Sequence, residues 1–163
     1  MKINFKKIFL KQTELDNEIA INHDVTYEST RERRTLALFV EIGELANSTR
    51  CFKYWSNKGS EEMSRVMDEY ADGLHFLVSL GIDAGIARYT YEQKESELSL
   101  TDLFVLMYEK LTKFAKTRKF KDYRILFETY LMIASKLGMV KKEIFDSYLL
   151  KLGENYHRQK TNY

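Results

Sequence analysis

Two pairs of acidic residues form the pattern in this sequence with the clearest chemical meaning. Each pair has two carboxylates three positions apart: Glu41 with Glu44, and Glu69 with Asp72. At about 100° per residue, side chains three apart on a helix lie within about 60° of one another, so each pair shares a helix face. Crowded carboxylates repel one another unless a proton or a cation is shared among them, and oxygen ligands suit magnesium. The spacing therefore predicts a Mg²⁺ site formed by these four side chains.

The two helices that carry these pairs are expected to form a hairpin. The first is predicted to run from about residue 29 or 30 to 49, and the second to begin near Ser60, which resembles an N-cap. Each pair then lies about two turns from the connection, so an antiparallel arrangement brings the pairs level. A single E-x-x-E pair is commonly a solvated helix face. Two matched pairs beside apolar positions such as Leu38 and Leu45 favour the metal site.

Two other groups of residues have types and spacing that suit a ligand. The aromatic rings of Phe52 and Trp55 flank Lys53, so a base could stack there while the ammonium faces a phosphate, although such rings more often pack in a core. Near the C-terminus a polar stripe with helical spacing could bind phosphate oxygens, although its basic members also complement the helix dipole. This stripe consists of Tyr148, Lys151, Asn155 and Arg158.

The elements that position these residues all have helical patterns. The chain has no proline and only seven glycines, and no segment alternates apolar and polar residues long enough to indicate a sheet. Gly81 and Gly138 are placed where helices would end. We therefore predict an all-α helical bundle of five or six helices, with residues 82–99 partly helical. The helices are expected at about 4–21, 29–49, 61–81, 101–117, 121–137 and 140–158.

Length and composition limit the class of protein. A chain of 163 residues with 44% hydrophobic and 31% charged residues suits one folded domain, residues 1–163. A net charge of +2 gives no field that indicates nucleic-acid binding. Cys51 is the only cysteine, which excludes an intramolecular disulfide and suits the cytoplasm. No apolar stretch reaches the length of a membrane span, so no membrane partner is expected.

Taken together, these segments resemble the dimeric dUTPase family of magnesium-dependent deoxyuridine triphosphatases, within the all-α NTP pyrophosphatase (MazG-like) superfamily. The resemblance covers most of the chain. It rests on QTELD at 12–16, EIGELAN at 41–47, FKYW at 52–55, DEYADGLHFLVSLGI at 68–82 and the spacing of the C-terminal stripe. The closing segment of the family commonly has glycine before tyrosine, whereas this chain has Asn162 before Tyr163.

The resemblance implies hydrolysis of dUTP, and typically dUDP, to dUMP by a water that a metal organises. It implies that Gln12 and Asp16 lie beside the nucleobase and that the protein is a homodimer. Among the four carboxylates it implies as Mg²⁺ ligands, we take Glu41 as the catalytic base. The residues it implies at the phosphates are Lys151, Asn155 and Arg158.

Two other functions fit the same sequence. One is a pyrophosphatase for another nucleotide, such as dCTP or a damaged nucleotide, and the other is an inactive helical binding or regulatory module. A complete set of carboxylate ligands argues against the second, because the loss of any ligand weakens coordination. Candidates for a subunit interface, each of which could also belong to the monomer core, are Tyr89, Tyr91, Phe104, Met107 and Tyr108.

Overall fold

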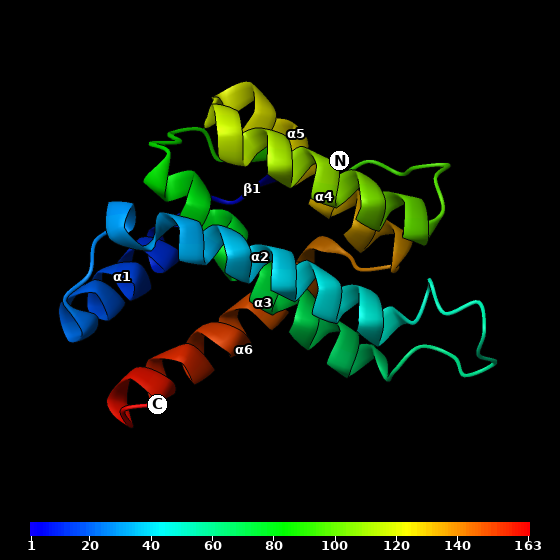
Figure 1. Ribbon diagram of the computed structural model, residues 1–163, viewed down its shortest axis with the longest axis horizontal. Coiled ribbons are helices and arrows are strands. Elements are labelled where there is room, and N and C mark those ends of the chain that lie inside the picture. Colours follow the sequence, from blue (N-terminus) through cyan, green and yellow to red (C-terminus); the bar gives the residue numbers. More distant parts are fainter.

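The computed structural model describes residues 1–163 and consists of six helices and one two-stranded sheet (Figure 1). This architecture confirms the predicted all-α helical bundle. None of the helices has the length and apolar character that a membrane span requires. In chain order the elements are β1 (Lys2–Asn4), α1 (Lys6–His23), α2 (Tyr27–Thr49), α3 (Met63–Asp83), β2 (Thr90–Glu92), α4 (Leu100–Thr117), α5 (Phe120–Lys136) and α6 (Lys141–Lys160).

Helix α3 is the centre of the bundle. It packs along α2 as the second arm of a hairpin, and it also contacts α1, α5 and α6. Helices α4 and α5 form a second pair, which lies above the α2–α3 hairpin in Figure 1, while α6 runs below it. One cluster of 32 buried apolar residues joins these layers. Because α3 is covered on several sides, most residues from Val66 to Gly81 are buried, and its polar side chains are held in fixed positions.

The structure also contains a small sheet that the sequence did not predict. Strands β1 and β2 pair antiparallel, with Ile3 opposite Tyr91, and both of these side chains are buried. Three residues are too few for an alternating pattern to be recognised, and the two strands are far apart in the sequence. Residues 82–99, expected to be partly helical, contain only the last turn of α3 and are otherwise strand and irregular chain.

Helix ends differ from the predictions by a few residues. Helix α2 begins earlier than expected, because Thr26 forms a capping box in which its Oγ1 accepts a hydrogen bond from the Ser29 amide at 3.1 Å. Helix α3 begins at Met63 after Glu62, so the assignment of Ser60 as its N-cap is wrong. Gly138 follows the end of α5 with a φ of 77°, as predicted for a glycine at that position.

Three of the proposed interface residues belong to the monomer core. Tyr91, Phe104 and Met107 are buried within the chain, so of the two positions open to them, interface or core, they occupy the core. Tyr89 and Tyr108 are half-buried. Tyr108 stacks on Phe39 with ring centroids 5.6 Å apart and donates a hydrogen bond to the Phe39 carbonyl oxygen, so it also has partners within the chain.

Gly81 lies within α3, which continues to Asp83, so the prediction that Gly81 ends the helix is wrong. The ring of Tyr123 on α5 packs against α3 at Gly81. Its hydroxyl donates a hydrogen bond to the Leu77 carbonyl oxygen at 2.8 Å. A Cβ atom at Gly81 would overlap the Oη and Cζ atoms of this fully buried tyrosine. The glycine is therefore required for the close approach of α5 to α3.

We predict that Gly81→Ala lowers the free energy of unfolding by about 2 kcal/mol or more, because the buried ring of Tyr123 must shift. Gly153→Ala is the matched control, since a Cβ at this helical glycine meets no atom within 4 Å. The control should be stabilising by roughly 0.5–1 kcal/mol, the usual difference between alanine and glycine inside a helix. Urea unfolding followed by circular dichroism measures both changes, and equal effects at the two positions would contradict the packing argument.

Candidate functional site

Three of the four predicted metal ligands come together between α2 and α3. Carboxylate oxygens of Glu41, Glu69 and Asp72 all lie within 4.8 Å of one another. Glu69 is buried, and the other two side chains are half-buried. Glu44 lies one turn along α2 and is exposed, outside this group of three, but it is close enough to raise the pKa of Glu41. The hairpin therefore brings the two acidic pairs level, as their spacing predicts.

The environment of these carboxylates disfavours their charged forms. Burial is the main cause that raises the pKa of Glu41 to about 8, and the neighbouring carboxylates of Glu44 and Asp72 add to it. Burial also raises the pKa of Glu69 and of Asp72, against the opposing charges of Arg65 and Lys151 respectively. In the absence of another cation, the group therefore favours the uptake of a proton.

The same residues fit a divalent cation. Glu41 Oε2 is buried and has no hydrogen-bond partner, so one strong acceptor in the cluster is left unsatisfied by the protein. Carboxylate oxygens are the hard ligands that Mg²⁺ prefers, and a divalent charge would relieve the repulsion between Glu41, Glu69 and Asp72. The donor set and the unpaired oxygen therefore both suit Mg²⁺.

A cavity of about 610 Å³ opens beside this cluster. Its volume is in the range of sites that bind small molecules. Elements α1, α2, α3 and α6 all contribute to its walls. Six residues predicted for the site line it: Gln12, Asp16, Glu41, Asp72, Asn155 and Arg158. The cavity therefore joins the acidic cluster to residues from both ends of the chain.

Gln12 connects two other groups at the buried end of the cavity. Its Nε2 donates a hydrogen bond to Asp16 Oδ1 at 2.9 Å, and its Oε1 accepts one from the Tyr148 hydroxyl at 2.9 Å. His75 Nδ1 lies 2.6 Å from the same Oε1, and the imidazole stacks on the Tyr148 ring with centroids 4.1 Å apart. These contacts fix the orientation of the Gln12 amide and of the His75 ring.

Asp16 is held by donors from three directions. In addition to Gln12, the Tyr27 and Ser79 hydroxyls donate to its Oδ2 at 2.9 and 2.8 Å. Burial nevertheless raises its pKa, because these hydrogen bonds only partly offset the loss of water. His75 and Ser79 were missed from the sequence, although they follow Asp72 at intervals of three and four on one face of α3. This helical spacing from Asp72 is the sequence signal that could have placed His75 and Ser79 in the site.

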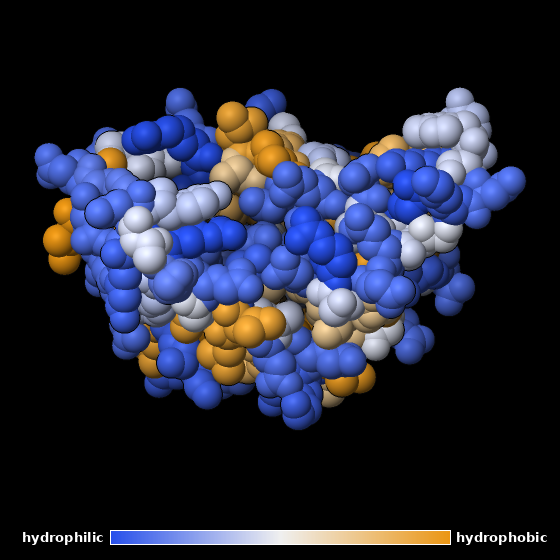
Figure 2. Space-filling view, turned by 90° about the horizontal axis from the view of Figure 1, so that it is seen from below, coloured by the Kyte–Doolittle hydropathy of each residue, from blue (hydrophilic) through white to orange (hydrophobic).

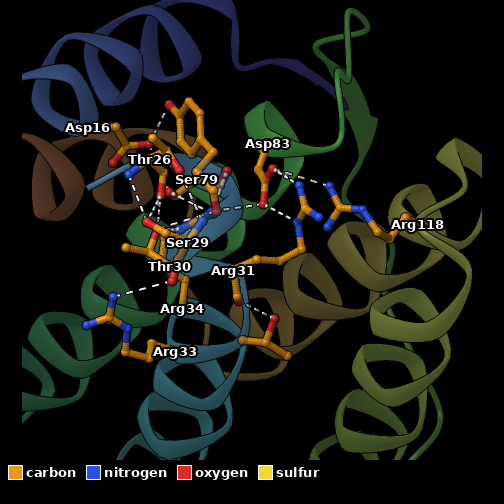
Figure 3. Close-up of polar contacts among 12 residues, drawn as sticks. Asp16, Thr26, Ser29, Thr30, Arg31, Arg33, Arg34, Ser79, Asp83 and Arg118 are labelled. Carbon is orange, nitrogen blue, oxygen red and sulfur yellow. Dashed lines mark hydrogen bonds and ion pairs between the residues drawn. The ribbon is translucent and has the colours of Figure 1, made fainter. Parts of the chain in front are cut away.

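An ion-pair network fixes the start of α2 next to the cavity (Figure 3). Asp83 at the end of α3 is nearly inaccessible and accepts hydrogen bonds from Arg31 and Arg34, each with a contact at 2.8 Å. Although burial opposes it, these hydrogen bonds hold the pKa of Asp83 below its ordinary value. Arg34 also lines the cavity and lies over the Tyr27 ring. The network thus holds α2 and α3 together at this end of the cavity.

The aromatic segment after α2 does not reach the cavity. Phe52 and Trp55 are 40% and 64% exposed, and neither they nor Lys53 line the cavity. Lys53 instead lies over the Phe52 ring, with its Nζ 5.8 Å from the centroid. The segment projects from the end of the hairpin in Figure 1. Within one chain, the predicted base and phosphate contacts of these three residues are therefore not formed.

The C-terminal residues cover another side of the cavity. The Arg158 guanidinium lies 4.9 Å from the centroid of the Tyr163 ring, and both residues line the cavity. Asn162 has a φ of 55°, a left-handed conformation that asparagine tolerates better than most residues with a side chain. Asn162 therefore adopts the left-handed backbone conformation that glycine would adopt at this position.

His75 makes the stability of the fold sensitive to acid. Burial lowers the pKa of His75 to about 4, from 6.5 in an unfolded chain. Below pH 6.5 the unfolded chain takes up a proton that the folded chain excludes, so stability is lost as the pH falls towards 4.

We predict that this loss amounts to about 3 kcal/mol in the free energy of unfolding and that His75→Asn removes it, because asparagine does not titrate. The exposed His157→Asn is the control and should retain the wild-type dependence. Urea unfolding at a series of pH values gives both curves, and the same acid slope in wild type and His75→Asn would contradict this role of His75.

Comparison with known proteins agrees with this geometry. The family model described as dUTPase matches residues 4–163, which is nearly the whole chain. Comparison with curated protein sequences gives no significant match. The matched residues include all six helices and the acidic cluster. The protein is therefore a member of the all-α dUTPase family, the enzymes that hydrolyse dUTP.

Proposed function

We propose that this enzyme hydrolyses dUTP, and also dUDP, to dUMP in a reaction that depends on Mg²⁺ held by Glu41, Glu69 and Asp72, with Glu44 beside them. The observation that carries the proposal is the convergence of three carboxylates, with oxygens within 4.8 Å of one another, at the edge of a cavity large enough for a nucleotide. The unpaired Oε2 of Glu41 supports a cation at the same place.

In the proposed reaction, water attacks a phosphorus atom while the bond to the leaving phosphate or pyrophosphate breaks. When bound, Mg²⁺ would neutralise developing negative charge and lower the pKa of the attacking water. Glu41 accepts the proton of this water, since it is a carboxylate of the cluster that also lines the cavity. Asn155 and Arg158, which line the cavity, donate hydrogen bonds to the phosphate oxygens.

The nucleobase lies at the opposite end of the cavity in this proposal. Gln12 and Asp16 are held rigidly there, so a base meets polar groups of fixed position. A rigid set of donors and acceptors can reject a base with the wrong pattern, because a mismatch leaves buried groups unpaired. Phe52, Trp55 and Lys53 lie outside this cavity of their own chain.

The proposal is tested by pyrophosphate release from dUTP, dCTP and dTTP, with Mg²⁺ and with a chelator. We expect release from dUTP in the presence of Mg²⁺ and preference for dUTP over the other two nucleotides. An equal rate with dCTP would assign the enzyme to a broader substrate class and leave the metal site intact. Turnover in the presence of the chelator would contradict the role of the metal.

We predict that Glu69→Gln and Asp72→Asn each lower kcat by about a hundredfold or more, because each keeps the size of the side chain and removes the charge of a ligand. Asp146→Asn, at an exposed acid of α6, is the control and should keep wild-type activity. Circular dichroism should be unchanged in all three. Full turnover by either site variant would refute the proposed ligand set.

We also propose that the enzyme is a homodimer. Leu36 and Val40, one turn apart on α2, are 63% and 50% exposed, and Val105 on the adjacent α4 is 64% exposed. Exposed apolar side chains on neighbouring elements are typical of interaction surfaces. By contrast, the face seen in Figure 2 is mainly hydrophilic, with apolar side chains in separate groups.

For the homodimer we predict a light-scattering mass of twice the 19.4 kDa chain at micromolar concentration, retained in high salt, because an apolar contact is not screened. Val40→Glu should shift the mass towards the monomer, whereas Ile21→Glu, at an exposed apolar residue of α1, should leave it unchanged. A monomeric mass in a fully active preparation would exclude the dimer.

Residues 1–163 are proposed to act as one domain in the cytoplasm. One cluster of buried apolar residues includes members of every helix, which supports a single unit. Cys51, the only cysteine, is a free thiol, which suits a reducing compartment.

A further inference from the structure

Lys151 has an unusual environment for a residue expected at a phosphate. Its side chain on α6 is only 4% exposed, and its Nζ contacts three carboxylates. The distances are 2.6 Å to Asp68 Oδ1, 3.1 Å to Asp72 Oδ2 and 3.2 Å to Glu154 Oε2. An ammonium group has three N–H donors, so three acceptors use its full capacity.

This geometry leaves Lys151 no free donor for a substrate. Lys151 does not line the cavity, whereas Arg158, two turns further along α6, does. A phosphate contact would require the ammonium to leave these carboxylates, and the half-buried Asp72 would then lose its one ion-pair partner. The contacts of Lys151 therefore point towards the metal carboxylates and away from the phosphates.

Two basic side chains form ion pairs with the acidic residues of the cluster. Arg65 forms ion pairs with Asp68 and Glu69, and Lys151 bridges Asp68 to Asp72 across one turn of α3. Lys151 occupies Oδ2 of Asp72, and no hydrogen bond or ion pair engages Oδ1. One oxygen of this ligand is thus fixed by α6 while the other is left for a cation.

We propose that Lys151 is a positioning residue that acts as the internal counter-cation of the metal carboxylates. It holds Asp72 in place, stabilises the protein without metal, and limits the affinity for a divalent ion by repelling it. The inference rests on the proposed metal site. Its chemical basis is that the removal of one positive charge makes the site more negative and increases its demand for another cation.

The test is Lys151→Met, which keeps an unbranched apolar stem and deletes the charge. We expect a lower Tm in chelator, roughly tenfold tighter binding of Mn²⁺ by electron paramagnetic resonance, and a larger rise of Tm on Mn²⁺ addition. The kcat should fall because Asp72 is less well held, while the KM for dUTP changes by less than about twofold. Arg158→Met is the contrasting variant and should mainly raise KM.

Asp68→Asn keeps the test decisive if Lys151→Met folds poorly. This variant removes the shortest contact of Lys151 and leaves Glu41, Glu69 and Asp72 unchanged. The loss of one negative charge should weaken Mn²⁺ binding, which is the opposite direction from Lys151→Met. The double variant Asp68→Asn with Lys151→Met should recover much of the Mn²⁺ affinity and metal-free Tm, because the two charges cancel.

The possible failures are distinguishable. If wild type binds no Mn²⁺, the metal site itself is refuted. If wild type binds Mn²⁺ but Lys151→Met has unchanged affinity and unchanged metal-free Tm, and raises KM as Arg158→Met does, then Lys151 is a phosphate ligand and the counter-cation role is refuted. Weaker Mn²⁺ binding by Lys151→Met would also overturn the role, since it reverses the predicted sign.

Discussion

The repulsion among carboxylates between α2 and α3 is the constraint on which the rest of the structure depends. Glu41, Glu69 and Asp72 are held together although burial already disfavours their charged forms. Such an arrangement persists only if packing elsewhere holds it in place and nearby cations reduce its cost. The packing of α3 at the centre of the bundle holds the carboxylates in place. Arg65 and Lys151 supply part of the positive charge that reduces their repulsion. A divalent ion supplies the remainder in the proposed function.

Close contacts of tyrosines with α3 give the hairpin its rigidity. The hydroxyls of Tyr123 and Tyr130 donate hydrogen bonds to carbonyl oxygens of α3, and each ring lies against a glycine, Gly81 and Gly73 respectively. A side chain at either glycine would push α5 away from α3. The same turns of α3 carry Asp72 and Ser79 towards the cavity on another face. Packing on one face of α3 therefore fixes the chemistry on the other.

The cavity has two ends with different properties. At one end, carboxylates with raised pKa values favour the uptake of a proton or a cation, and a bound metal ion there would suit a reaction at phosphate. At the other end, Gln12, Asp16 and His75 are bonded to one another, so their donors and acceptors are fixed before any ligand binds. Such preorganisation favours selection of one base, because a rigid site cannot adapt to a mismatch without leaving polar groups unpaired. Helix α6 contacts the groups at both ends, Gln12 through Tyr148 and Asp72 through Lys151.

Helical periodicity and the spacing of the acidic residues were readable without a structure, because both depend on neighbours three or four positions away. They were sufficient for the all-α bundle, the α2–α3 hairpin and the meeting of Glu41 with Glu69 and Asp72. Contacts between distant segments depended on the tertiary structure, since local spacing carries no information about them. These contacts pair β1 with β2, join His75 to Gln12, bury Tyr91 in the core and leave Trp55 exposed. Lys151 shows the difference most clearly: its spacing on α6 suggested a phosphate ligand, but the packing of α6 on α3 placed its ammonium among carboxylates, where all three donors are used.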